Sequence, residues 1–184
     1  MSVFISDTAV VDPSAKIGED TKIWHFSQIR DNVVIGNGCN IANGVYIDSG
    51  VEIGNNVSIQ NKSSIYRPVV IEDDVFIGPN VCLANDKNPR SGVIRDLEGI
   101  SWTVHQGASI GANTVIMPDV IIGKYALVGA GSVVTKDVPE HALMVGNPAK
   151  VIGYVCVCGH RLDDSNTCLK CKKKIDIKRG KNGK

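Results

Sequence analysis

The chain has 184 residues, of which 43% are hydrophobic and 21% are charged, and its formal net charge is +1 at neutral pH. These values fit one soluble domain with a small appendage. No stretch of the sequence is long and apolar enough to span a bilayer, and no apolar run near the N-terminus resembles a signal peptide. We therefore expect no membrane span and a cytoplasmic location.

An aliphatic residue recurs at every sixth position along most of the chain. The first run is Ile5, Val11, Ile17, Ile23, Ile29, Ile35, Ile41, Ile47, Ile53, Ile59, Ile65, Ile71, Ile77 and Leu83, and the pattern resumes at Val104, Ile110, Ile116, Ile122, Val128 and Val134. A period of six is neither the helical period of 3.6 nor a simple strand alternation, and it is typical of a parallel β-helix. An ordinary sandwich of short strands is the alternative, but a sandwich does not keep one phase for so long.

Turn-forming residues stand three positions after twelve of these aliphatic residues. They are Asp20, Asn32, Gly38, Gly44, Gly50, Asn56, Asp74, Asn80, Gly107, Asn113, Asp119 and Gly131. Gly, Asn and Asp tolerate the left-handed backbone conformation that a tight corner needs. Each hexad is therefore interpreted as one short strand and one corner, and three hexads close a triangular coil. We expect about 6–7 coils, or roughly 32 Å of prism at ~4.8 Å per strand.

Three segments depart from the six-residue register. Residues 84–103 interrupt a β-helix predicted over residues 1–138 and must protrude as a loop, and long excursions from a regular scaffold are usually functional. Residues 139–153 are predicted to cap the open end. Residues 154–184 form a separate module with a basic tail. Such a tail can bind nucleic acid or anionic lipid, but it lacks interleaved aromatic residues, so a solvated end is favoured and nucleic acid is not expected as a partner.

The C-terminal module contains two closely spaced cysteine pairs, in the pattern C-x-C…C-x-x-C. The four cysteines are Cys156, Cys158, Cys168 and Cys171. This arrangement suits tetrahedral coordination of zinc by thiolates, with His160 able to replace one of them. A segment this short cannot bury a useful core, so a structural zinc ion would hold it together. The alternative is four free thiols on a disordered tail, and disulfides are not expected in the cytoplasm.

Strings such as IGNGCN, IGNNVS, IGANTV and VGAGSV resemble the hexapeptide-repeat acyltransferases, whose coils are left-handed. The resemblance implies an all-β fold, a left-handed parallel β-helix with one protruding loop and a small zinc-ribbon-like module. IWHF at 23–26, IQN at 59–61, NDKNPRS at 85–91 and DVPEHALMVGNPAK at 137–150 together resemble the nucleotide-linked 3-amino-sugar N-acetyltransferases. The nearest group acetylates a UDP-linked 3-amino-2-acetamido-glucuronate, and a sister group acetylates dTDP-linked 3-amino-dideoxyhexoses.

This resemblance implies transfer of an acetyl group from acetyl-CoA to the 3-amino group of a nucleotide sugar, in surface polysaccharide or glycan biosynthesis. An amine is a good nucleophile once deprotonated, so a strong general base is less needed than for a hydroxyl acceptor. Asn85 is implied to orient the amine, and either Asp86 or the departing thiolate would take the proton. No cysteine is placed as a covalent nucleophile, so direct attack is expected.

Binding residues are expected along the seams between subunits of a homotrimer, because a flat-sided prism has little concavity of its own. The candidate substrate-binding residues are Trp24, His25, Asn61, Lys62, Tyr66, Arg67 and Arg90. Arginine and lysine suit the pyrophosphate or a sugar carboxylate. The candidate acetyl-CoA residues are Gly111, Ala112, Gly129, Ala130, Gly131, Lys136 and Lys150, which offer small side chains for pantetheine and ammonium groups for phosphates.

Three other functions remain as alternatives. A sugar O-acetyltransferase is the nearest, although the loop contains no histidine to act as a base. A γ-type carbonic anhydrase would need a close histidine pair, which the chain lacks. A binding scaffold without catalysis would have no use for the long loop. His105 and His141 have no evident partner and are interpreted as structural.

Overall fold

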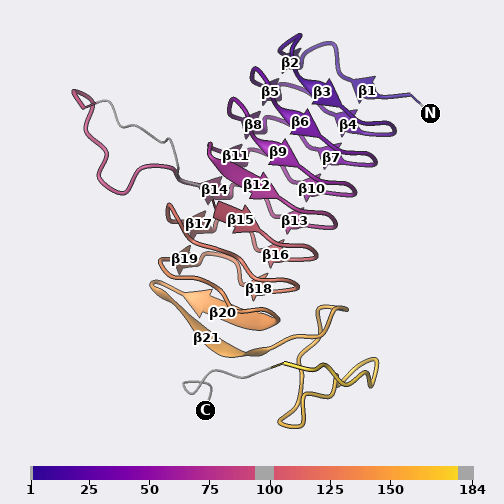
Figure 1. The fold of residues 1–184 in the computed structure, drawn as a ribbon, viewed down its shortest axis with the longest axis vertical. Helices are drawn as coiled ribbons and strands as arrows, with labels where there is room; N and C mark the ends of the chain where they lie inside the picture. Colours follow the sequence, from indigo (N-terminus) through magenta and orange to yellow (C-terminus); the bar gives the residue numbers. More distant parts are fainter. Residues whose placement is uncertain (1, 94–101, 178–184) are drawn as a thin grey trace.

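The computed structural model describes residues 2–93 and 102–177 (Figure 1). These residues form a column of stacked triangular coils, built from short strands and turns without any helix in the described part. One loop projects from the side of the column, and the C-terminal module lies at the end opposite the N-terminus. Within residues 2–93 and 102–177, no helix has the length and apolar character needed to cross a membrane.

Three sheets form the walls of the column. Sheet A contains β1 (Phe4–Ile5), β4 (Lys22–Ile23), β7 (Asn40–Ile41), β10 (Ser58–Ile59), β13 (Phe76–Ile77), β16 (Ser109–Ile110), β18 (Leu127–Val128), β20 (Ala142–Gly146) and β21 (Ala149–Tyr154). Sheet B contains β2 (Val10–Val11), β5 (Gln28–Ile29), β8 (Tyr46–Ile47), β11 (Ser64–Ile65), β14 (Cys82–Leu83), β17 (Val115–Ile116) and β19 (Val133–Val134). Sheet C contains β3 (Lys16–Ile17), β6 (Val34–Ile35), β9 (Glu52–Ile53), β12 (Val69–Ile71) and β15 (Trp102–Val104), and bridges through Ile122 and Val138 extend it.

Successive coils pair in parallel register, and the partners are 18 residues apart in the regular coils before and after the loop. Pairs that bridge the loop, such as Val69 with Trp102, are 33 residues apart. Ile23 pairs with Ile41, which is followed in sheet A by Ile59 and Ile77. In Figure 1 the near strands β3, β6, β9 and β12 run from left to right while the chain descends, which is the sense of a left-handed coil. The expected fold class is confirmed: the chain is a left-handed parallel β-helix of about seven coils, with a four-cysteine cluster at its C-terminal end.

The aliphatic residue of each hexad points into the column. Residues such as Ile41, Ile59 and Ile77 are completely buried, and together they form one continuous core. The exception is the first coil, where Ile5 is 45% exposed because no coil lies above it. Burial in this architecture depends on stacking against neighbouring coils on both sides.

The twelve corner residues predicted from the sequence all adopt positive φ angles, between 56° and 71°. Phe26, Lys62 and Tyr125 occupy equivalent corners and also have positive φ, at 61°, 61° and 54°. The backbone of the coil therefore imposes this conformation even where the side chain disfavours it. The corners that follow strands of sheets A, B and C are called the A–B, B–C and C–A corners below.

The protruding loop leaves the column at a B–C corner, after β14, and the chain rejoins the column in β15. Its first ten residues, 84–93, are described by the structure, whereas residues 94–101 lie outside the described residues. Trp102 already pairs with Val69, so the last two residues of the expected loop, 102 and 103, belong to the strand. At the other end, β20 and β21 form an antiparallel hairpin that pairs with β18 and covers the last coils.

Candidate active site

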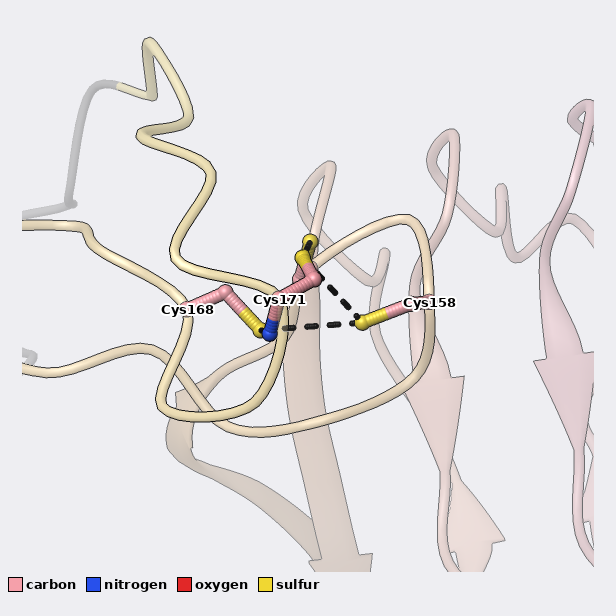
Figure 2. Close-up of side chains that lie close together, drawn as sticks. Cys158, Cys168 and Cys171 are labelled. Atoms are coloured by element: carbon pink, nitrogen blue, oxygen red, sulfur yellow. Dashed lines mark hydrogen bonds between the residues drawn. The ribbon is translucent and has the colours of Figure 1, made fainter.

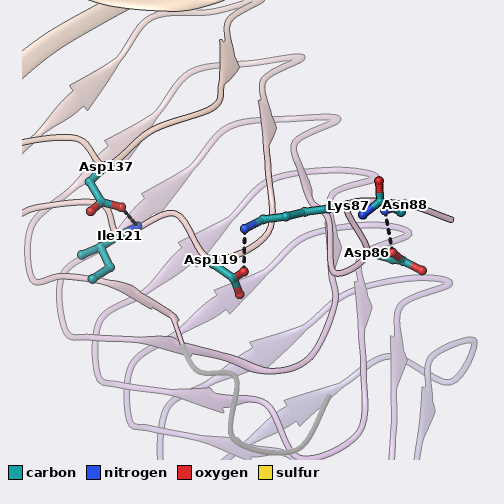
Figure 3. Close-up of polar contacts among 6 residues, drawn as sticks. All are labelled: Asp86, Lys87, Asn88, Asp119, Ile121 and Asp137. Atoms are coloured by element: carbon teal, nitrogen blue, oxygen red, sulfur yellow. Dashed lines mark hydrogen bonds and ion pairs between the residues drawn. The ribbon is translucent and has the colours of Figure 1, made fainter. Parts of the chain in front are cut away.

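The loop begins with the two residues expected to carry out catalysis. Ala84 N donates to Ile116 O at 3.0 Å, which holds the start of the loop on the next coil. Asn85 and Asp86 follow and are both half-buried. Asp86 Oδ1 accepts a hydrogen bond of 2.7 Å from Asn88 N, so its carboxylate is oriented by the turn that follows (Figure 3).

An ion pair joins the loop to the coil below it. Lys87 Nζ lies 2.7 Å from Asp119 Oδ2, and Asp119 is the corner residue of the next B–C corner (Figure 3). At the B–C corner of the following coil, Asp137 Oδ1 accepts a 2.9 Å hydrogen bond from Ile121 N. The two aspartates therefore fix the shape of the column edge beneath the catalytic candidates.

A groove of about 520 Å³ lies along this edge. Its walls are formed by Lys87, Met117, Pro118, Asp119, Val120, Thr135, Lys136 and Asp137. Met117, Pro118 and Val120 offer an apolar strip, while Lys136 is an exposed cation at the far end. An apolar wall with a few charged groups suits a ligand that combines a flexible chain with anionic groups.

Two of the expected substrate residues lie one coil above Asn85 at the same edge. Tyr66 N donates to Leu83 O at 3.4 Å, and Tyr66 packs against Tyr46 with ring centroids 5.5 Å apart. Arg67 is exposed, and its backbone N–H reaches Asp48 Oδ2 at 3.4 Å. The stacking of coils thus brings Tyr66 and Arg67 to the corner of Asn85. Arg90 lies further out in the loop, where its guanidinium donates to Pro89 O at 2.8 Å.

The other expected substrate residues lie at A–B corners, on a different edge of the same chain. Trp24 Nε1 donates to Asn40 Oδ1 at 2.8 Å, and Phe4 packs on its ring at a centroid distance of 5.1 Å. His25 Nδ1 lies 2.7 Å from Ser6 Oγ. They are three coils above β13, or roughly 14 Å along the column.

Asn61 and Lys62 share this edge, two coils below Trp24. Asn61 Oδ1 accepts a hydrogen bond of 3.1 Å from Asn43 N, which is a contact between stacked corners. Lys62 has the left-handed φ of 61° described above, and its side chain is exposed. One copy of the chain therefore does not gather the expected substrate residues into a single cleft.

The small residues expected at acetyl-CoA also lie at A–B corners, namely Gly111, Ala112, Gly129, Ala130 and Gly131. A Cβ atom at Gly111 would lie 2.5 Å from Ala130 N, and one at Gly129 would lie 2.6 Å from Val145 Cγ1. A larger residue at either position would therefore collide with the segment of the chain that stacks next to it. Gly131 has φ of +70° and open space around it. Lys136 lines the groove, whereas Lys150 is exposed on β21.

The site residues expected from the sequence do not include Lys87, Asp119, Met117 or Thr135, which line the groove. The six-residue repeat could have indicated that Asp119 lies near the loop. Asp119 stands three residues after Ile116, just as Asp86 stands three residues after Leu83. Stacking of Ile116 on Leu83 places these two corners one above the other. The break in register at the loop concealed this relationship.

The two histidines interpreted as structural have structural partners. His105 Nδ1 lies 2.9 Å from Glu72 Oε1. His141 is 4% exposed, stacks on Tyr125 at a centroid distance of 5.3 Å and lies 2.9 Å from Val155 O through Nδ1. Neither histidine lines the groove beside the loop.

The four C-terminal cysteines converge on one point. Their Sγ atoms all lie within 4.8 Å of one another, and the group can hold a metal ion (Figure 2). The Cys156–Cys171 and Cys158–Cys168 sulfur distances are both 3.6 Å, and all four thiols are free. Burial raises the pKa of Cys156 to about 12, whereas a hydrogen bond from Cys171 N–H lowers the pKa of Cys168 to about 6.

A left-handed β-helix with a loop beside an edge groove is the architecture of a hexapeptide-repeat transferase. The profile of the family described as bacterial transferase hexapeptide (six repeats) matches residues 14–49, 50–85 and 103–136, which is more than half of the chain. The chain therefore belongs to this family, and it is an acetyltransferase.

Two relatives refine this assignment. The chain is 47% identical over 176 residues to the dTDP-3-amino-3,6-dideoxy-α-D-galactopyranose 3-N-acetyltransferase of Aneurinibacillus thermoaerophilus, with 92% of this chain and 91% of the relative covered. It is 38% identical over 87 residues to the galactoside O-acetyltransferase of Escherichia coli, covering 46% and 43% of the two chains.

Among solved structures, the chain is similar to a mutant of the GDP-perosamine N-acetyltransferase of Caulobacter crescentus in complex with CoA and GDP-perosamine. The TM-score is 0.59 and the identity 26%, with 82% of this chain but only 56% of that chain covered. A putative acetyltransferase of Bacillus cereus gives a TM-score of 0.56 at 25% identity, covering 84% and 83% of the two chains.

These findings change the order of the substrate expectations. From the sequence, a UDP-linked 3-amino-2-acetamido-glucuronate is the first expected substrate and a dTDP-linked 3-amino-dideoxyhexose the second. The similarity over nearly the whole of both chains is to an enzyme of the second kind, so the alternative has the better support. The expectation of an acetyl-transferring enzyme is confirmed, and the non-enzymatic scaffold is set aside.

Proposed function

We propose that the chain transfers the acetyl group of acetyl-CoA to the 3-amino group of a dTDP-linked 3-amino-dideoxyhexose. The observation that carries this proposal is the 47% identity to a dTDP-3-amino-3,6-dideoxygalactose N-acetyltransferase, which extends over 92% of the chain. The solved relative bound to CoA and GDP-perosamine, an amino-sugar nucleotide, supports the same class of reaction.

The transfer proceeds by direct attack of the amine on the thioester. The side-chain oxygen of Asn85 accepts a hydrogen bond from the amine and directs its lone pair at the acetyl carbon. The carbon–nitrogen bond forms, the carbon–sulfur bond breaks, and the proton passes to Asp86 or to the departing thiolate. Asn85 and Asp86 are half-buried at the base of the loop, which supports this role. Correct orientation of the amine relative to the thioester by itself lowers the barrier of such a transfer.

Acetyl-CoA lies in the groove beside the loop in this proposal. The strip formed by Met117, Pro118 and Val120 receives the pantetheine chain, and Lys136 meets a phosphate group. The thioester then reaches the base of the loop, where Asn85 and Asp86 stand.

A homotrimer completes the site. The candidate residues of one chain occupy two separate edges, with Asn85, Tyr66 and Arg67 at B–C corners and Trp24 and Asn61 at A–B corners. Closed cyclic assembly places an edge of one copy against a different edge of its neighbour. Both sets of residues then face one seam, which binds the nucleotide sugar opposite acetyl-CoA.

The test is acetyl transfer by the purified protein with acetyl-CoA and four acceptors. These are dTDP-3-amino-3,6-dideoxygalactose, dTDP-3-amino-3,6-dideoxyglucose, UDP-3-amino-2-acetamido-glucuronate and a dTDP-sugar with a 3-hydroxyl group. Free thiol release gives the rate, and mass spectrometry with an alkali wash separates stable amides from labile esters. We expect the highest kcat/KM with a dTDP-3-amino sugar and an alkali-stable product. A preference for the UDP acceptor, an ester product or no turnover would each overturn the proposal.

A further inference from the structure

We propose that Cys156, Cys158, Cys168 and Cys171 bind one Zn²⁺ ion as four thiolates, and that this ion fastens the C-terminal module to the end of the β-helix. This inference is independent of the acetyl-transfer proposal. It assigns to residues 155–177 a metal-dependent structural role that the chemistry of the loop does not require.

The spacing of the sulfur atoms is that of a single tetrahedral ion. Zinc binds thiolates at about 2.3 Å, so the edge of a regular tetrahedron of sulfurs is about 3.8 Å. The Cys156–Cys171, Cys158–Cys168 and Cys158–Cys171 sulfur distances are 3.6, 3.6 and 3.7 Å. All four sulfurs lie within 4.8 Å of one another, which is too compact for an iron–sulfur cluster, where two or more metal ions separate the thiolates.

Two tight turns present the sulfurs to this point. In the first, Gly159 N donates to Cys156 O at 2.8 Å and Gly159 has φ of +82°. In the second, Cys168 Sγ accepts hydrogen bonds of 3.4 Å from Lys170 N and Cys171 N. N–H groups directed at a sulfur stabilise the thiolate form that a metal requires. Figure 2 shows Cys158 facing Cys168 and Cys171 across the space between the two turns.

The surrounding charge is complementary to a four-thiolate zinc centre. Such a centre carries a net charge of −2, and the second turn contributes Lys170 and Lys172 around Cys171, followed directly by Lys173 and Lys174. His160 Nδ1 lies 3.7 Å from Cys158 Sγ and 3.3 Å from Cys158 O. The four sulfurs already complete a tetrahedron, so His160 lies beside the ligand set and outside it.

The module has little else to hold it in place. Its contacts with the β-helix include Val155 N to His141 O at 2.8 Å and His141 Nδ1 to Val155 O at 2.9 Å. Leu162 and Ile177 are only partly buried against the core. A segment this small does not supply enough apolar burial to fold without a cross-link, and a metal ion provides one. Because Cys156 follows β21 by two residues, the ion is attached directly to the hairpin that covers the last coils.

The first test measures metal in the whole protein purified without added zinc or chelator. Inductively coupled plasma mass spectrometry should find about one zinc per chain, and Co²⁺ exchange should give the visible absorption bands of tetrahedral thiolate coordination. Stoichiometric iron, or less than about a tenth of an equivalent of any metal together with four titratable thiols, would overturn the assignment.

The second test compares a proposed zinc ligand with a cysteine that lies outside the cluster. Cys158→Ser should lose most of the zinc, whereas Cys82→Ser, in β14, should keep it. Limited proteolysis should then cut within residues 155–177 of Cys158→Ser at least tenfold faster, with unchanged β-sheet circular dichroism. If Cys158→Ser does not fold, removing the metal from the native protein with an organomercurial gives the same measurement. Unchanged proteolysis after zinc removal would refute the fastening role. Neither the metal content nor the proteolysis rate depends on acetyl transfer.

Discussion

Lys87 Nζ and Asp119 Oδ2 are 2.7 Å apart, and this ion pair connects the first turn of the loop to the corner of the following coil. Lys87 follows the two catalytic candidates directly, so a change at Asp119 acts on Asn85 and Asp86 through the loop backbone. Asp119 is thus a positioning residue in the proposed mechanism.

We expect Asp119→Asn to lower kcat roughly two- to fivefold with a smaller effect on the thermal midpoint, since an exposed ion pair is worth about 0.2–1 kcal/mol. Asparagine tolerates the left-handed backbone conformation at position 119, where φ is 61°. Asp74→Asn is the matched control, because Asp74 is a corner residue with φ of 60° on another edge. Steady-state kinetics of both variants make the comparison, and equal effects at both corners would argue against a positioning role.

Asn85→Ala should reduce kcat by about 100-fold or more with the thermal midpoint unchanged, because correct orientation of the amine is the main contribution assigned to this side chain. Asn88→Ala is the control, since Asn88 is an exposed asparagine in the same loop. Turnover with saturating acetyl-CoA measures the effect. A variant at position 85 that retains full turnover would remove Asn85 from the mechanism.

Gly111→Ala should destabilise the protein by about 1–3 kcal/mol, because the added Cβ atom would lie 2.5 Å from the backbone nitrogen of Ala130. Gly92→Ala should be close to neutral, since nothing lies within 4 Å of a Cβ atom there. Denaturant unfolding measures both. Similar stability of the two variants would show that the coils separate more easily than their stacking suggests.

Ile59→Ala should cost about 2–5 kcal/mol, the usual range for a cavity left by a buried isoleucine. Ile59 is completely buried in a middle coil, whereas Ile5 is 45% exposed in the first coil. Ile5→Ala should therefore cost much less. The free energies of unfolding of the two variants test whether the core gains its stability from stacking on both sides.

Ser49→Ala should raise the pKa of Asp31 towards its ordinary value. Ser49 Oγ donates to Asp31 Oδ1 at 2.6 Å, and this hydrogen bond is the main cause of the lowered pKa of Asp31. A lowered pKa stabilises the fold at pH values above the ordinary aspartate pKa, and this contribution is lost as the pH falls through the lowered one. NMR titration of the Asp31 carboxyl in both proteins measures the change, and an unaltered titration would contradict the assigned cause.

The fold was predictable because each hexad specifies its own strand and corner. Asn32, Asn56 and Gly38 are turn formers, so their left-handed corners could be expected from the sequence. Phe26 and Tyr125 have the same backbone conformation without that signal, since there the stacked neighbours impose the conformation on residues that disfavour it.

The candidate site was less predictable because it depends on contacts between distant residues. The Lys87–Asp119 pair spans the break in register, so a count of hexads does not reveal it. Gly111 and Gly129 are candidate residues for acetyl-CoA binding, and their missing side chains also make room for Ala130 and Val145. A small side chain has the same appearance in a sequence whether a ligand or the protein itself occupies the space.

The 18-residue pairing distance has a consequence for how this protein can change length. Adding eighteen residues within the upper coils would lengthen the column by one coil and keep the loop and the groove aligned with the corners above the insertion. Adding only six would turn the loop and the groove together by a third of a revolution, so they would no longer lie on the same edge as those corners. Natural or engineered length variants of this chain should therefore come in multiples of three repeats.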